Sequence, residues 1–299
     1  MRRTLVAALA AVAVALAALP ALAEPLKVVT SFSILGDMVR QIGGDAVAVT
    51  TLVGADGDAH VYEPTPADAR AVAAADVVVV NGLGFEGWMG RLVKAAGYKG
   101  PVVFATRGIK PIKGDHDHGH DHGEDPHAWQ SVGNARIYAD NIVAGLVDAA
   151  PAMADGLRAG HAAYTSELNA LDRDIKAALA PVPKVDRRIV TSHDAFGYYA
   201  RAYGVTFLAP VGISTEAEPS AGDVARLIRQ MKKEKARAVF VESIADPRLL
   251  EQIARETGAR IGGRVYSDAL SGPEGPAPSY VAMMRHNTRL FVEALKPGS

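Results

Sequence analysis

The chain has 299 residues, and its 32 Lys and Arg against 33 Asp and Glu give a formal net charge of −1. This balance excludes a nucleic-acid partner, which would call for a strongly basic surface. Half of the residues are hydrophobic, and the length favours two domains over one. Because the chain contains no cysteine, a metal site in it must use His, Asp or Glu.

The first 23 residues are typical of a secretory signal peptide. Arg2 and Arg3 precede an apolar stretch, and small residues typical of a cleavage site end at Ala23. The apolar stretch is too short for a stable membrane span. We therefore expect a protein exported to the periplasm, and one without a lipid anchor because there is no cysteine to carry the lipid.

Apolar, β-branched runs alternate with helical patterns in the next part of the chain. The predicted strands are 26–30, 47–53, 77–81 and 102–105. Strands that alternate with helices favour an α/β lobe with a mainly parallel sheet, which we assign to residues 24–150.

The end of this lobe carries the run DHDHGHDHGEDPH, residues 115–127, with five of the nine histidines of the chain. Imidazoles interleaved with carboxylates suit a divalent cation such as zinc, although a merely solvated loop is the alternative. Gly119 and Gly123 predict a segment too flexible for a tight site, so we expect weak auxiliary binding by four histidines of the run. These are His116, His118, His120 and His122.

A helix is predicted over 134–149, and a longer linking helix lies within 151–182. In the linking helix six apolar residues recur at spacings of three, four and seven, which places them on one face. They are Leu157, Tyr164, Leu168, Leu171, Ile175 and Leu179.

The alternation of strands and helices then restarts, which predicts a second α/β lobe over residues 183–299. Its strands are expected at 188–192, 205–209, 238–242 and 260–267. Ser220 and Asp223 form a capping-box pattern before a helix, and a final helix is predicted over 280–295. The fold class is thus α/β, with two similar lobes and mainly parallel sheets.

Ligands of open parallel sheets bind at the carboxyl ends of the strands, where four polar residues stand out. A lone histidine in such a loop is more often a capping or surface residue than a ligand. Three imidazoles and one carboxylate, two from each half, instead favour a metal site in a cleft between the lobes. The four residues are His60, His127, His193 and Asp268.

Several stretches resemble the successive motifs of the zinc and manganese ABC-transporter solute-binding proteins, the cluster A-I family that includes the zinc-uptake and TroA-like proteins. They are HVYEPTPADARAVAAADVVVVNGLGFEGW, DPHAW, TSHDAFGYYARAYG, ISTEAEPSAGDVARLI and YSDALS. The resemblance implies two α/β lobes joined by a long rigid helix, with the ion held between them and delivered to a membrane permease. His60, His127 and His193 match the family's three histidine positions, and Asp268 matches its carboxylate position.

The choice of metal depends on the third of these positions. Family members devoted to manganese commonly place a glutamate there, whereas this chain has His193. Three nitrogens and one oxygen suit tetrahedral Zn(II), while Mn(II) prefers more oxygens. We expect a zinc receptor, with manganese as the alternative because a bidentate Asp268 would raise the coordination number.

Two other function classes fit the sequence less well than the receptor. A secreted zinc hydrolase would need an open metal position, but four protein ligands close a tetrahedral site, and the chain has no HExxH helix. A histidine-rich metal buffer would rely on residues 115–125 alone. We expect no catalysis, a monomer and the permease as partner. The loop has two alternative roles, collecting free zinc or accepting it from a periplasmic zinc donor protein.

Two carboxylates have two possible roles each. Glu242 ends a predicted strand, where it could accept a hydrogen bond from a ligand histidine or cap the next helix. Glu63 lies close to His60 in sequence and has the same ambiguity.

Overall fold

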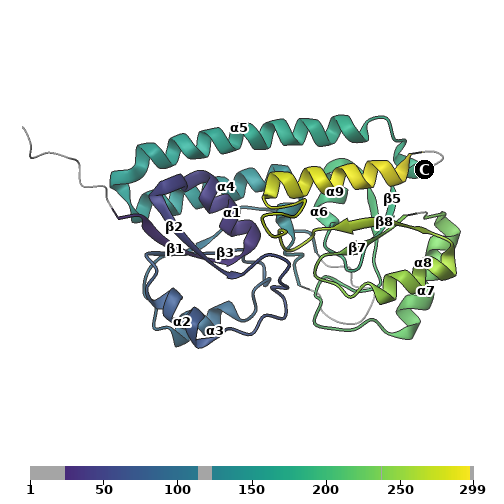
Figure 1. The fold of residues 1–299 in the computed structure, drawn as a ribbon, viewed down its shortest axis with the longest axis horizontal. Helices are drawn as coiled ribbons and strands as arrows, with labels where there is room; N and C mark the ends of the chain where they lie inside the picture. The colour runs from purple at the N-terminus through teal and green to yellow at the C-terminus, as the bar shows by residue number, and fades with distance from the viewer. Residues whose placement is uncertain (1–23, 114–122, 237, 297–299) are drawn as a thin grey trace, which may run out of the picture.

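The computed structural model describes residues 24–113, 123–236 and 238–296, which form two α/β lobes (Figure 1). The N-terminal lobe contains a four-stranded parallel sheet in the order β2-β1-β3-β4. Its elements are β1 (Leu26–Phe32), α1 (Ser33–Gly43), β2 (Val47–Val53), α2 (Pro66–Ala73), β3 (Val77–Val80), α3 (Met89–Ala95) and β4 (Val102–Phe104).

The C-terminal lobe repeats this plan, with a parallel sheet in the order β6-β5-β7-β8. Helices α7 and α8 lie on one side of this sheet, and α9 lies on the other (Figure 1). The elements are β5 (Arg188–Val190), α6 (Gly197–Tyr203), β6 (Thr206–Leu208), α7 (Ala221–Glu234), β7 (Ala238–Glu242), α8 (Arg248–Thr257), β8 (Arg260–Val265) and α9 (Tyr280–Leu295).

Two helices connect the lobes. Helix α4 (Val132–Ala149) leads into α5 (Ala154–Leu179), which runs along both lobes and packs on α1 at one end and on α6 and α9 at the other (Figure 1). The six apolar residues predicted to share one face of the long helix are the buried residues of α5. Burial of this stripe against both lobes is what makes the helix a brace between them.

Local sequence explains much of the secondary structure. The central strand β3 reads VVVV and is buried throughout, as expected for a parallel strand covered on both faces. Helix α7 begins at the predicted capping box, in which Ser220 accepts from the backbone N–H of Asp223 and the Asp223 carboxylate accepts from that of Ser220.

The predicted fold class is confirmed. All eight predicted strands are present, each with ends within two residues of the prediction, and both sheets are parallel. The final helix has the predicted bounds, and α4 begins two residues earlier than predicted. None of the helices in the described ranges combines the length and apolar character needed to cross a membrane.

Candidate metal centre

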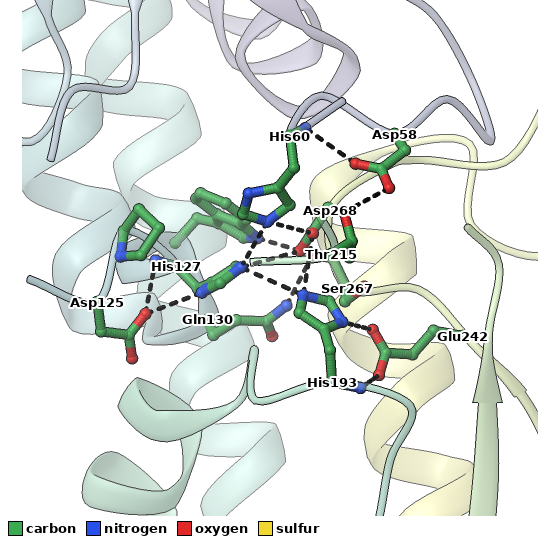
Figure 2. A network of polar contacts seen from close by, with 12 residues as sticks. Asp58, His60, Asp125, His127, Gln130, His193, Thr215, Glu242, Ser267 and Asp268 are labelled. Carbon is green, nitrogen blue, oxygen red and sulfur yellow. Dashed lines mark hydrogen bonds and ion pairs between the residues drawn. The ribbon is translucent and has the colours of Figure 1, made fainter. Parts of the chain in front are cut away.

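The structure brings the four predicted ligands together between the lobes. His60 lies in the loop between β2 and α2, and His127 immediately precedes a 3-10 turn (Ala128–Gln130) that leads into α4. His193 follows β5, and Asp268 follows β8. Because each sheet is parallel, its strands all end at the same edge, and the two edges present these side chains to each other (Figure 2).

The donor atoms form a compact cluster within 4.8 Å of one another. The Nε2 atom of His127 lies 3.3 Å from that of His60 and 3.4 Å from that of His193. Asp268 Oδ2 lies 3.3 Å from His60 Nε2 and 3.2 Å from His193 Nε2, while its Oδ1 lies 3.6 Å from His127 Nε2. Three nitrogens and a carboxylate therefore face one point from four directions (Figure 2).

The cluster is removed from solvent. His60 is 8% exposed, and the other three residues are 1% exposed or less. Among the described residues, neither oxygen of the fully buried Asp268 carboxylate accepts a hydrogen bond outside the cluster. A buried, ionised carboxylate is costly unless a cation compensates it. The positive charge that compensates the buried Asp268 carboxylate must come either from protons on the neighbouring histidines or from a metal ion among them.

Two carboxylates lie behind the imidazoles of His127 and His193. Asp125 Oδ1 accepts a hydrogen bond from the backbone N–H of His127 and lies 2.8 Å from its Nδ1. Glu242 does the same for His193: Oε1 accepts from the backbone N–H, and Oε2 lies 2.6 Å from Nδ1. With a neutral imidazole, a proton on Nδ1 would leave the Nε2 lone pair directed at the cluster, which is the arrangement found behind many metal-bound histidines.

These contacts show the roles of the two carboxylates that the sequence left ambiguous. Glu242 is buried behind His193 and is a hydrogen-bond acceptor for it rather than a helix cap. Glu63 is exposed on the surface, whereas the carboxylate that contacts the backbone of His60 belongs to Asp58.

Sequence reasoning missed Asp58 and Asp125, although a short signal for both was present. Each stands two residues before its histidine, in Asp-Ala-His and Asp-Pro-His. Asp side chains readily accept a hydrogen bond from the backbone N–H two residues further on. Both do so at 2.9 Å, which fixes the backbone of each histidine.

Aromatic side chains form an apolar wall on the N-terminal side of the cluster. The Phe85 ring lies 4.7 Å from His60 and 4.8 Å from Trp129, between ring centroids. Trp129 in turn packs 5.3 Å from His127. These rings restrict the rotation of the His60 and His127 imidazoles and keep water away from them, which strengthens every electrostatic contact within the cluster.

The carbonyl just before Asp268 joins the lobes. Ser267 O accepts hydrogen bonds from Trp129 Nε1 and Gln130 Nε2, both at 2.8 Å. Trp129 and Gln130 directly follow the ligand-bearing segment at His127. These bonds therefore fix the position of Asp268 relative to a histidine of the other lobe.

The charges of the cluster shift the pKa values of its members. Burial by itself lowers the pKa of His127, but the carboxylates of Asp268 and Asp125 outweigh it and raise that pKa to about 9. Glu242 and Asp268 likewise raise the pKa of His193 despite its burial. Burial raises the pKa of Asp268, but His193 and His127 outweigh it and hold that pKa well below its usual range.

A divalent ion is therefore expected to displace protons from the metal-free site at pH 7. The pKa of about 9 places a proton on His127 at that pH, and the pKa of His193 is raised in the same direction, whereas a metal ligand must be neutral imidazole. We expect release of at least about one proton per zinc ion, and an affinity that increases as the pH increases towards about 9. Calorimetric titration at pH 7 in two buffers of different ionisation enthalpy measures the number of protons released per zinc ion. A binding enthalpy that does not depend on the buffer would contradict this prediction.

The same shifts give the pH dependence of the metal-free fold. The raised pKa of His127 contributes stability that is fully present below the unfolded-state pKa of about 6.5. This contribution is lost as the pH increases through about 9, where the buried histidine loses its proton beside two carboxylates.

The predicted auxiliary histidines, His116, His118, His120 and His122, lie outside the described residues, as do the signal peptide and most of the histidine-rich run. The run's last histidine, His127, is described and belongs to the cluster.

The fold and the cluster together define a class: a two-lobed receptor that encloses a metal ion between α/β lobes. Residues 28–294 match the family model described as the zinc-uptake complex component A, periplasmic. The chain belongs to this family of metal-binding solute receptors of ABC transporters, which are binding proteins and not enzymes.

Relatives and solved structures agree with this assignment. The chain is 36% identical to the manganese-binding lipoprotein MntA of Halalkalibacterium halodurans over 91% of this chain and 89% of that protein. It is 33% identical to the iron-binding protein YfeA of Yersinia pestis over 88% and 84% of the two chains. The periplasmic zinc-binding protein TroA of Treponema pallidum superposes with a TM-score of 0.85 and 28% identity, over 91% of this chain and all of that one.

Proposed function

We propose that this protein is a periplasmic zinc receptor, which captures Zn(II) between its lobes with His60, His127, His193 and Asp268 and delivers it to a membrane permease. The observation that carries the proposal is the buried Asp268 carboxylate, which faces three histidine Nε2 atoms at 3.2–3.6 Å. Three nitrogens and one carboxylate form a donor set suited to zinc.

The spacing of the donors supports zinc further. The centre of a regular tetrahedron lies about 0.61 of an edge from each corner. Donors about 2.0–2.2 Å from one tetrahedral zinc ion therefore lie about 3.3–3.6 Å from one another. The separations of 3.2–3.6 Å around His127 and Asp268 are close to this spacing, and all four donors lie within 4.8 Å of one another.

Manganese is the second candidate, and the orientation of Asp268 favours it. Oδ2 faces His60 and His193 while Oδ1 faces His127, so both oxygens are available to one ion. A bidentate carboxylate would give the higher coordination number and oxygen content that Mn(II) prefers. Relatives whose names specify manganese or iron add weight to this alternative.

Metal release is proposed to be local. Helix α5 packs on both lobes, and such a brace limits rotation of one lobe against the other. Release would then require displacement of the ligand-bearing loops rather than a wide opening of the cleft.

The proposed location and partners follow from the same role. The leader-like first 23 residues support export to the periplasm, and the absence of cysteine from the 299 residues supports a receptor without a cysteine-linked lipid, unlike the relatives named as lipoproteins. A permease is the partner that the family assignment implies, and we propose that the histidine-rich loop collects zinc or receives it from a periplasmic donor.

Elemental analysis of protein recovered from the periplasm of cells grown with both zinc and manganese tests the proposed cargo, because competition at equal concentrations in vitro favours zinc at most nitrogen and oxygen sites. The recovered protein is expected to hold one equivalent of tightly bound zinc. A variant lacking residues 115–122 serves as the control for the loop, because it should keep this equivalent and lose only weakly bound zinc. Retention of manganese would establish the second candidate, and loss of all tight binding in the loop variant would make the protein a metal buffer.

A further inference from the structure

We propose that the hydrogen bond from Thr215 to Asp58 is a latch between the lobes, and that it slows release of the metal ion without contacting that ion. The inference rests on the proposed function, since it concerns the rate at which the same site gives up its cargo. It makes Thr215, which lies within the stretch ISTEAEPSAGDVARLI, a positioning residue.

The carboxylate of Asp58 joins two loops through its two oxygens. Oδ1 accepts a hydrogen bond of 2.9 Å from the backbone N–H of His60, and Oδ2 accepts one of 2.7 Å from Thr215 Oγ1 (Figure 2). Asp58 and His60 belong to the N-terminal lobe, whereas Thr215 lies between β6 and α7 of the C-terminal lobe. The position of one ligand is thereby connected to the other lobe.

The segment that carries Thr215 is also connected to a second proposed ligand, His193. Val211 pairs with His193 in an isolated parallel bridge, and the backbone N–H of Asp194 donates to Gly212 O at 3.2 Å. The latch therefore completes a continuous connection from the His193 turn, through residues 211–215, to the loop of His60. Moving either loop away from the ion requires that this connection break or that both loops move together.

Comparison of the two Asp-x-His segments shows why His60 is the ligand that needs such support. The carboxylate of Asp125 directs Oδ1 to both the backbone N–H and Nδ1 of His127, and its link to the C-terminal lobe is through its backbone carbonyl, which accepts from the Tyr198 hydroxyl at 2.8 Å. Asp58 contacts only the backbone of His60 in this way and directs its second oxygen to Thr215. His60 is also the most exposed of the four proposed ligands. It is therefore the ligand expected to leave first when the site opens.

Loss of the latch would weaken the closed state without dismantling it. The beginning of the His60 loop has a separate anchor, in which the backbone N–H of Asp56 donates to Leu270 O at 2.9 Å. Asp58 and Thr215 are both half-buried, so the hydroxyl-to-carboxylate bond is partly shielded from competing water. For a charge-assisted bond of this kind we expect a change of about 10-fold in the dissociation rate.

The test is the rate of zinc release from the full mature chain. Zinc-loaded protein is mixed in a stopped-flow instrument with a fluorescent zinc chelator, at chelator concentrations where the rate no longer depends on the chelator. Thr215→Val is expected to release zinc about 10-fold faster than wild type, and Thr215→Ser to restore a rate close to wild type. Thr257→Val is the matched control, because Thr257 Oγ1 bonds within its own helix α8 in the same lobe.

Two further measurements separate a latch from a general disturbance. The visible absorption spectrum of the cobalt(II)-substituted protein, which reports the donor set, should be the same for Thr215→Val and wild type. In an Asp58→Ala background, Thr215→Val should add no further acceleration, because the partner oxygen is already absent.

The latch is overturned by a wild-type release rate in Thr215→Val, by an undiminished effect in the Asp58→Ala background, or by an altered cobalt spectrum. Failure of the proposed function has a different signature, since wild-type protein would then hold no zinc tightly. In that case the same comparison of rates is made with manganese(II), whose faster release from Thr215→Val would still support the latch.

Discussion

Replacement of His193 by alanine is expected to lower zinc affinity by at least about 100-fold. The substitution removes one of four donors and leaves the buried carboxylates of Glu242 and Asp268 without their shared imidazole. Loss of a group that only orients a metal ligand already lowers metal affinity about 10- to 100-fold, so loss of the ligand itself should lower it more. Competition titration against a chelator of known affinity provides the measurement, and His60→Ala and His127→Ala are expected to behave in the same way.

Two variants control this experiment. His193→Gln keeps a polar side chain beside Glu242, so it separates loss of a metal ligand from loss of the fold. His161→Ala removes a histidine in α5 that contacts Asp140 at 2.8 Å, and it should bind zinc like the wild type. Wild-type affinity in any of the three cluster variants would refute the assignment of that residue as a ligand.

Zinc is expected to raise the midpoint of thermal unfolding by about 8–16 °C. The four donors come from both lobes, so only the folded chain presents them together. A ligand at 1,000 times its dissociation constant stabilises the native state by about 4 kcal/mol, and each kcal/mol shifts the midpoint by about 2–4 °C in a chain of this size. Differential scanning calorimetry with and without zinc measures the shift.

The shift should depend on the cluster and not on the histidine-rich run. His193→Gln is expected to lose most of the zinc-dependent shift, while deletion of residues 115–122 is expected to preserve it. A shift of the same size in the His193→Gln protein would mean that zinc stabilises the chain from another site.

The sequence by itself predicted the local elements and their order. Alternation of apolar runs with helical patterns gave the two lobes, and the stripe of α5 was identified residue by residue because a helical period of 3.6 is a local property. The capping box at Ser220 was predicted for the same reason. The four clustered side chains could be named in advance, since each follows a strand and has a chemical type that binds metals.

The tertiary structure alone decided how these elements meet. Strand order determines which loops are neighbours, and docking of the lobes brings Trp129 to the carbonyl of Ser267, 138 residues away. The contact between Thr215 and Asp58 across 157 residues depends on the same docking. Glu242 lies behind His193 for a different reason, because β5 and β7 pair within one sheet. Such contacts join segments that no local period relates, so their partners appear only in the folded chain.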